Sequence, residues 1–254
     1  MKQRIHHGLL AASLLPAALL MGCGGSDNGL PQLAAATPGT LQSCTDLASK
    51  IHIANTTITA ASPVAAGAVT AAGASVPAHC LVTGNMFPRV SPTDGKNYAI
   101  GFEMRLPNAW NGRFFYQANG GSDGLVLPAL GGGGPQPQVA LQQGFAVISS
   151  DAGHSGQGNL AFGIDFQARL DYGYQAVAKL TPMAKSLITT AYGKGPDRSY
   201  ISGCSNGGRH TFVAMTRMAD QYDGYLAGAP GYRLPLAAIA NQERAKHLAT
   251  VATN

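Results

Sequence analysis

The chain has 254 residues, of which 45% are hydrophobic and only 11% are charged, and its formal net charge at pH 7 is +5. This composition can bury a substantial core, and it excludes the highly charged, apolar-poor class of disordered proteins. No cluster of Lys and Arg follows the first residues, which argues against a nucleic-acid-binding surface. We therefore expect one large globular domain or two small ones.

The N-terminus has the features of an export signal over residues 1–22. Two basic residues precede the apolar stretch GLLAASLLPAALLMGC, which is too short for a membrane span and is followed by a glycine-rich segment. Residues 20–23 are similar to a lipobox, in which Cys23 would become the lipid-bearing first residue. Simple secretion, with cleavage near residues 22–26, is the alternative. In both cases we expect the mature protein outside the cytoplasm, as a periplasmic or outer-membrane lipoprotein or as a secreted protein, where disulfides persist.

A linker is predicted over residues 23–43, because residues 24–40 are rich in Gly, Pro and Ala and show no hydrophobic period. From Cys44 onward, the segments IHIANTTITAASPVAAG, HCLVTGNMFPRV and YAIGFEMRLP have the β-branched runs and the alternation of strands. Cys44 and Cys80 bracket this region and are expected to pair with each other. If Cys23 carries lipid, the cysteine count is odd, which calls for an explanation in an exported protein.

Beyond residue 98, short strands alternate with helices. Strands are predicted at 113–117, at 145–149, in RSYISG and in DGYLAGAP, and LPALGGGGPQPQ is predicted to be a flexible loop. Apolar spacing predicts a helix over 166–191, which Pro182 breaks or restarts, and a second helix in GRHTFVAMTRMADQY. This alternation predicts an α/β fold whose central strands are parallel.

The segment YISGCSNGGRH places one serine, Ser205, between Gly203 and Gly207 in the pattern G-x-S-x-G. A nucleophilic serine needs a sharp strand-to-helix turn that raises its hydroxyl above a sheet, and small neighbours permit that close packing. The predicted strand before it and helix after it supply the required context. The helix would also add its N-terminal dipole and amides to an oxyanion site. A glycine turn that buries an inert serine is the alternative.

This serine block, followed by DGYLAGAP, resembles the tannase and feruloyl esterase family of α/β-hydrolases. Three further blocks of the family stand upstream in order: NGGSDG at 119–124, SSDAGHSG at 149–156 and YGYQAV at 172–177. The resemblance covers about residues 44–235 and implies an α/β-hydrolase fold with a mostly parallel sheet flanked by helices. The family includes esterases of gallate and ferulate and relatives that cleave the mono-ester of terephthalate. It implies a small aromatic ester as substrate and no cofactor.

The resemblance also implies roles for individual residues. Ser205 would attack the ester carbonyl, and the backbone N–H groups of Asn206 and Gly121 would hold the oxyanion, with Gly120 as the alternative to Gly121. An acyl-transfer intermediate carries a negative oxygen that needs such donors. In this family a cysteine just before the serine is bonded to one just before the catalytic histidine, which is the role implied for Cys204. That bridge would hold the base and the nucleophile together.

The segment DAGH contains Asp151 and His154, which could suggest a catalytic pair. Both precede the serine, however, whereas α/β-hydrolases run in the order Ser, then Asp or Glu, then His. We therefore expect a structural role for this block, with Asp151 accepting hydrogen bonds from turn amides.

The acid, the base and the second cysteine of the family are not expected among the residues after Ser205. The acidic residues and histidines there are Asp220, Asp223, Glu243, His210 and His247. His210 is expected in the helix that leaves the serine turn. Residues 236–254, which include His247, are expected to be a helical segment where the family begins its lid.

The expected protein is thus the N-terminal part of a longer serine esterase, with a partial hydrolase domain over 44–235 and without the lid and the last strands. Alone it would be inactive or nearly so. A non-catalytic exported binding module on a hydrolase scaffold is the alternative. No acidic loop resembles a calcium site, so no metal is expected, and a lipid on Cys23 would be the only membrane contact. The sequence leaves the oligomeric state open.

Overall fold

The computed structural model describes residues 33–132 and 137–251. The chain divides into two compact units, Met1–Ala35 and Ala36–Asn254. The expected signal peptide and Cys23 lie outside the described residues. The helices and strands of the described residues all belong to the second unit.

The described residues of the second unit form three sheets. The strands are β1 (Gly39–Thr40), β2 (Thr56–Val64), β3 (Thr70–Ala71), β4 (Ala74–Ser75), β5 (His79–Val90), β6 (Asn97–Pro107), β7 (Ala109–Trp110), β8 (Arg113–Ala118), β9 (Ala146–Ser150), β10 (Arg198–Cys204) and β11 (Gly224–Gly228). The α-helices are α1 (Leu47–Lys50), α2 (Phe166–Leu170), α3 (Ala176–Tyr192), α4 (Asn206–Arg217) and α5 (Leu234–Val251). No described helix has the length and apolar character needed to cross a bilayer.

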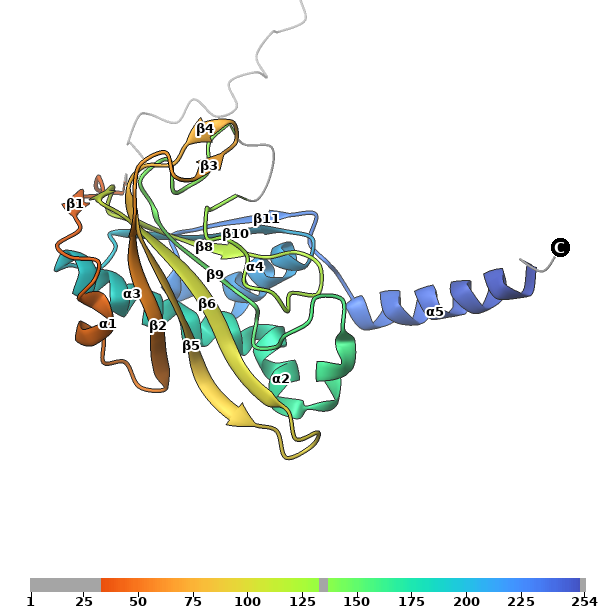
Figure 1. Cartoon of the computed structure of the whole chain (residues 1–254). Coiled ribbons are helices and arrows are strands. Elements are labelled where there is room, and N and C mark those ends of the chain that lie inside the picture. The colour runs from red at the N-terminus through yellow and green to blue at the C-terminus, as the bar shows by residue number, and fades with distance from the viewer. Residues whose placement is uncertain (1–32, 133–136, 252–254) are drawn as a thin grey trace, which may run out of the picture. The chain divides into compact units, whose positions relative to one another are not determined.

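The main sheet has seven strands in the order β11-β10-β8-β9-β6-β5-β2 (Figure 1). Strands β11, β10, β8 and β9 run parallel to one another, and β6, β5 and β2 continue the sheet in antiparallel pairs that begin with β9–β6. The sequence-predicted strands at 113–117 and 145–149 correspond to β8 and β9. Because parallel strands end at one edge, the loops after β8, β9, β10 and β11 meet there.

The larger core lies between this sheet and its helices. Helix α3 contacts β6 and β9, and α4 contacts β8, β10 and β11 (Figure 1). Alternate strand residues such as Ile100, Phe114 and Ile148 are fully buried against helix residues such as Leu180. A smaller cluster includes Val147 and the loop residue Leu141. Together these clusters make the sheet a rigid base for the loops at its edge.

The predicted interruption of the 166–191 helix at Pro182 is wrong. Helix α3 runs through Pro182 without a break, and a π-helical turn, Asp171–Gln175, lies upstream of it instead. Pro182 is exposed, whereas Leu180, Met183 and Leu187 around it are buried. The tertiary packing of this buried side outweighs the hydrogen bond that proline cannot donate.

Of the expected linker over 23–43, residues 23–32 lie outside the described residues, and the compact second unit begins at Ala36. Gly39 and Thr40 pair with β7, and Thr37 donates its backbone N–H to Asp197 at 2.7 Å. Cys44 and Cys80, the two cysteines expected to pair, are joined by a disulfide with Cα atoms 5.4 Å apart. Local composition alone could not show that residues of this glycine- and alanine-rich stretch pair with β7.

Helix α5 covers most of the segment expected to be helical at 236–254. None of its described residues is buried. Its exposed side chains include Leu236, Ile239 and Leu248.

Candidate active site

Ser205 lies at the turn between β10 and α4, at the carboxyl end of the parallel strands. Its side chain is exposed, and its backbone has φ 60° and ψ −118°. Its N–H donates to the Gly228 carbonyl at 3.0 Å, and its own carbonyl accepts from the N–H groups of Arg209 and Gly231, each at 3.0 Å. A non-glycine residue keeps a strained backbone only where its surroundings fix it. These three hydrogen bonds supply that constraint.

The glycines around Ser205 are required by space. A Cβ added at Gly203 would lie 2.4 Å from the Ala118 carbonyl oxygen, and one at Gly207 would lie 2.2 Å from the same oxygen. A Cβ at Gly208 would lie 2.5 Å from the Gly228 carbonyl oxygen. Helix α4 can therefore approach the end of β8 only because these positions carry no side chain.

Strained backbone recurs at this edge of the sheet. A non-glycine residue with positive φ follows each of the four parallel strands: Asp123 (54°) after β8, Ala152 (59°) after β9, Ser205 (60°) after β10 and Ala229 (37°) after β11. Such residues cluster at functional sites, and ligands of open α/β sheets bind beyond the carboxyl ends of the strands. This edge is the candidate active site.

The loop after β8 runs against the serine turn. The buried Asn119 anchors it by donating from Nδ2 to the Ser150 carbonyl at 2.9 Å. A Cβ at Gly120 would lie 3.4 Å from the Cys204 carbonyl oxygen, so the Gly120–Gly121 turn passes next to the residue before Ser205. Gly121 has φ 67°, which favours glycine.

A buried carboxylate links this loop to helix α4. The Asp123 Oδ2 atom accepts hydrogen bonds from Asn206 Nδ2 at 2.6 Å and from His210 Nε2 at 2.8 Å. The three side chains are only 3%, 4% and 3% exposed. Burial lowers the pKa of His210, which favours the neutral ring. Because an ionised carboxylate can only accept, the Nε2–H tautomer fits this contact.

The sequence patterns did not single out Asp123 or assign a partner to His210. Asn206 and His210 stand four residues apart, so their side chains share one face of α4. That spacing was the available signal, but it does not reveal a carboxylate 83 positions away from Asn206.

The π-helical turn supplies the other side of this network. Tyr172 donates from its hydroxyl to Asn206 Oδ1 at 3.2 Å, and Arg209 Nε donates to the same oxygen at 2.7 Å. The Arg209 guanidinium also donates to the carbonyls of Tyr172 and Gly173, each at 3.0 Å. These carbonyls belong to the π-turn, and such turns are frequent at functional sites.

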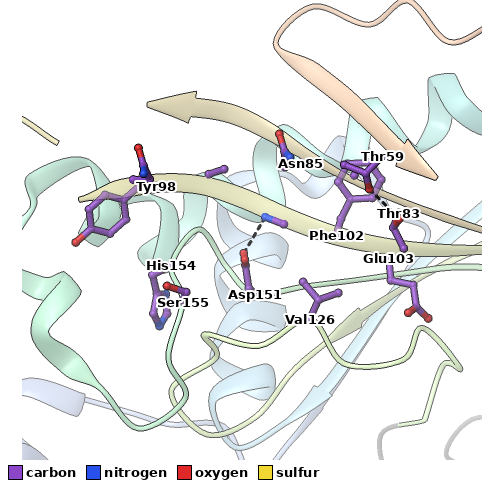
Figure 2. Close-up of a pocket in the computed structure, with 14 residues that line it drawn as sticks. Thr59, Thr83, Asn85, Tyr98, Phe102, Glu103, Val126, Asp151, His154 and Ser155 are labelled. Atoms are coloured by element: carbon purple, nitrogen blue, oxygen red, sulfur yellow. Dashed lines mark hydrogen bonds between the residues drawn. The ribbon is translucent and has the colours of Figure 1, made fainter. Parts of the chain in front are cut away.

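Asp151 accepts hydrogen bonds from turn and strand amides, as expected from the sequence. Its Oδ1 receives the N–H of Gly101 at 3.0 Å and that of Gly153 at 2.8 Å. Figure 2 shows the first of these bonds, at a cavity of about 520 Å³ that Asp151 and His154 help to line. Burial raises the pKa of Asp151 to about 7. The His154 ring is buried and stacks on Phe162 with centroids 3.7 Å apart.

The acidic residues and histidines after Ser205 are not assembled around it. Asp223 accepts from the Ser199 N–H at 2.8 Å, near the start of β10. It therefore lies at the amino ends of the parallel strands, opposite to Ser205. Glu243 pairs with Lys246 on the exposed helix α5, which also carries His247. Within residues 33–132 and 137–251, no hydrogen bond joins the Ser205 hydroxyl to a histidine.

Cys204 forms no disulfide with the described residues, and its thiol is exposed. No three or more His, Cys, Asp or Glu side chains of the described ranges gather closely enough to hold a metal ion.

A serine on a strained strand–turn–helix connection, at the carboxyl edge of a parallel sheet covered by helices, places the fold in the α/β-hydrolase class. The comparison with known proteins is more specific. The chain belongs to the tannase and feruloyl esterase family, whose model matches residues 80–249.

Named relatives and solved structures agree with this assignment. The chain is 41% identical over 196 residues to mono(2-hydroxyethyl) terephthalate hydrolase of Piscinibacter sakaiensis, covering 74% of this chain and 32% of the relative. It is 33% identical over 211 residues to feruloyl esterase B of Aspergillus niger, covering 79% of this chain and 38% of that relative. The crystal structure of feruloyl esterase B from Aspergillus oryzae superposes with a TM-score of 0.62 at 28% identity, covering 74% of this chain and 36% of that one. The chain thus spans about a third of the length of these relatives.

The close approach of α4 to β8 predicts that Gly207→Ala is disruptive. Its Cβ would meet the Ala118 carbonyl, so the free energy of unfolding should fall by about 1–3 kcal/mol, as in other overpacked sites. Gly173→Ala is the matched control, because a Cβ there meets no atom within 4 Å. Urea denaturation followed by circular dichroism measures both variants. Equal losses in the two would contradict the packing argument.

The raised pKa of Asp151 predicts that the free energy of unfolding depends on pH. Its folded pKa of about 7 lies above the unfolded value, so its contribution is fully present at low pH and is lost as the pH rises to 7. Between pH 4 and 7 the free energy of unfolding should fall by up to about 1.4 kcal/mol per pH unit relative to Asp151→Asn, which cannot ionise. Urea denaturation of both proteins from pH 5 to 8 measures this. A difference that stays constant with pH would show that Asp151 is ionised throughout.

Proposed function

We propose that the protein carrying this sequence is a serine carboxylic-ester hydrolase that acts on esters of aromatic acids. The observation that carries the proposal is the exposed Ser205 on its strained turn at the carboxyl edge of the sheet. Family membership supports the reaction class. The relatives named for terephthalate and ferulate esters support the aromatic acyl group.

In the proposed mechanism, the Ser205 hydroxyl attacks the ester carbonyl and the alcohol leaves from the tetrahedral intermediate. Water then hydrolyses the acyl-enzyme and releases the acid. The backbone N–H groups of Asn206 and Gly121 would stabilise the negative oxygen. In support, neither N–H donates a hydrogen bond to an acceptor in the described part of the chain. Asn206 also begins α4, where the helix dipole favours negative charge.

The general base and its acid partner are proposed to lie outside residues 1–254. In support, no histidine of the described residues bonds to the Ser205 hydroxyl. The same region would supply the cysteine that pairs with Cys204. Residues 1–254 alone should then hydrolyse esters slowly, since a serine without a base is a weak nucleophile. We also propose that the protein is exported, which the Cys44–Cys80 disulfide supports.

Ser205→Ala tests this function in the protein at its full encoded length. With a methyl ester of an aromatic hydroxy acid, we expect the variant to lose kcat at least about a thousandfold, because no other group replaces the nucleophile. Ser186→Ala, at an exposed position of α3, is the control and should keep full activity. Unchanged hydrolysis by Ser205→Ala would overturn the assignment. No hydrolysis by the wild type would favour a non-catalytic binding module.

The 254-residue chain gives a separate test of the missing base. We expect it to turn over the same ester slowly or not at all. Efficient hydrolysis that depends on Ser205 would show that the base lies within these residues.

A further inference from the structure

The Asn206 side chain is held at both ends. Its Nδ2 donates to Asp123 at 2.6 Å, and its Oδ1 accepts from Tyr172 and Arg209 at 3.2 and 2.7 Å. We propose that Asp123 is a positioning residue for the oxyanion site, and that it acts through the Asn206 side chain to fix the direction of the Asn206 backbone N–H. This inference rests on the proposed esterase function.

The chemistry of the three partners gives the amide a single orientation. Asp123 can only accept, and the Tyr172 hydroxyl and the Arg209 guanidinium donate to the opposite end of the amide. A flipped amide would place its NH₂ group against the Arg209 donor and its oxygen against a carboxylate. Because Asn206 is only 4% exposed, water cannot replace the lost partners. These three side chains therefore fix the orientation of the Asn206 amide at the start of α4.

The same carboxylate ties together the two proposed oxyanion donors. Asp123 lies two residues after Gly121 on the loop that follows β8, and Asn206 begins α4 after β10. The bond from Asn206 to Asp123 therefore sets how far the loop and the helix stand apart. Oxyanion donors stabilise the transition state only when both point at the position the oxygen will occupy, so this spacing matters for the rate.

His210 prevents the carboxylate from turning away. Its Nε2 lies 2.8 Å from the same Asp123 oxygen, one helical turn below Asn206. Asp123 has a φ of 54°, a backbone conformation that aspartate adopts more readily than most residues. The arrangement is thus constrained from the loop as well as from the helix.

Asp123→Ala, which removes the shared acceptor, and Tyr172→Phe test the proposal in the protein at its full encoded length. Both should lower kcat for an aromatic ester, by about 10- to 100-fold for Asp123→Ala, with KM changed by less than about twofold, because an oxyanion contact forms only in the transition state. Tyr98→Phe is the matched control: it also removes a hydroxyl that donates to a side-chain oxygen, that of Asp94 at 2.9 Å, and should leave kcat unchanged. Unchanged kcat in Asp123→Ala and Tyr172→Phe would overturn the proposal.

The exchanged pair, Asp123→Asn with Asn206→Asp, separates positioning from general destabilisation. It restores one donor and one acceptor between the two positions, and the new carboxylate at 206 still accepts from Tyr172 and Arg209. We expect it to recover part of the kcat lost in Asn206→Asp alone, in which two carboxylates face each other and the donor is missing. A double variant as slow as the product of the two single losses would show that the positions act independently, against the proposal.

A readout that needs no activity uses the 254-residue chain. The backbone amide NMR signals of Asn206 and Gly121 should both shift in Tyr172→Phe and Asp123→Ala, and neither should shift in Tyr98→Phe. If the full-length wild type hydrolyses no ester, the proposed function fails while these signals still test the coupling. If the signals of Asn206 and Gly121 stay in place in both site variants, the positioning role fails whatever the activity.

Discussion

The Ala118 carbonyl oxygen, at the end of β8, occupies the space where side chains at Gly203 and Gly207 would begin. Because both positions are glycine, α4 can begin directly over the end of β8. Ser205 is thereby forced into a left-handed backbone conformation and projects outward instead of packing into the core. The stability lost to the strained turn is offset by the surrounding hydrogen bonds and by the buried sheet beneath it.

The loops at this edge support one another through side chains that accept or donate from fixed positions. Asn119 ties the loop after β8 to the end of β9, and Asp123 ties the same loop to α4. Arg209 ties α4 to the π-turn that precedes α3. The five sequence blocks that first suggested the family are therefore parts of one hydrogen-bonded structure around Ser205. Such support is what a preorganised site requires, because donors that must reorganise stabilise a transition state poorly.

The features that sequence could predict depend on local pattern. Strands β8 and β9, the serine turn and helix α4 follow from periodicity and glycine spacing within a few residues. The Asp123 network could not be predicted, because its partners meet only after the loop after β8 and helix α4 are brought together by the sheet. The helix break predicted at Pro182 is wrong for a related reason. The tendency of proline to end a helix is outweighed by the burial of the apolar side of α3 against the sheet. The docking of Gly39 and Thr40 on β7 likewise depends on a tertiary contact that composition does not report.

The central claim is that Ser205 forms a covalent acyl intermediate during ester hydrolysis. Rapid acid quench of the full-length protein with an aromatic ester, followed by peptide mass spectrometry, tests this most directly. We expect the mass of the aromatic acyl group on the peptide that contains Ser205, transiently and before the acid product accumulates. Ester turnover with no acyl adduct on any serine, or with the adduct on a different residue, would contradict it.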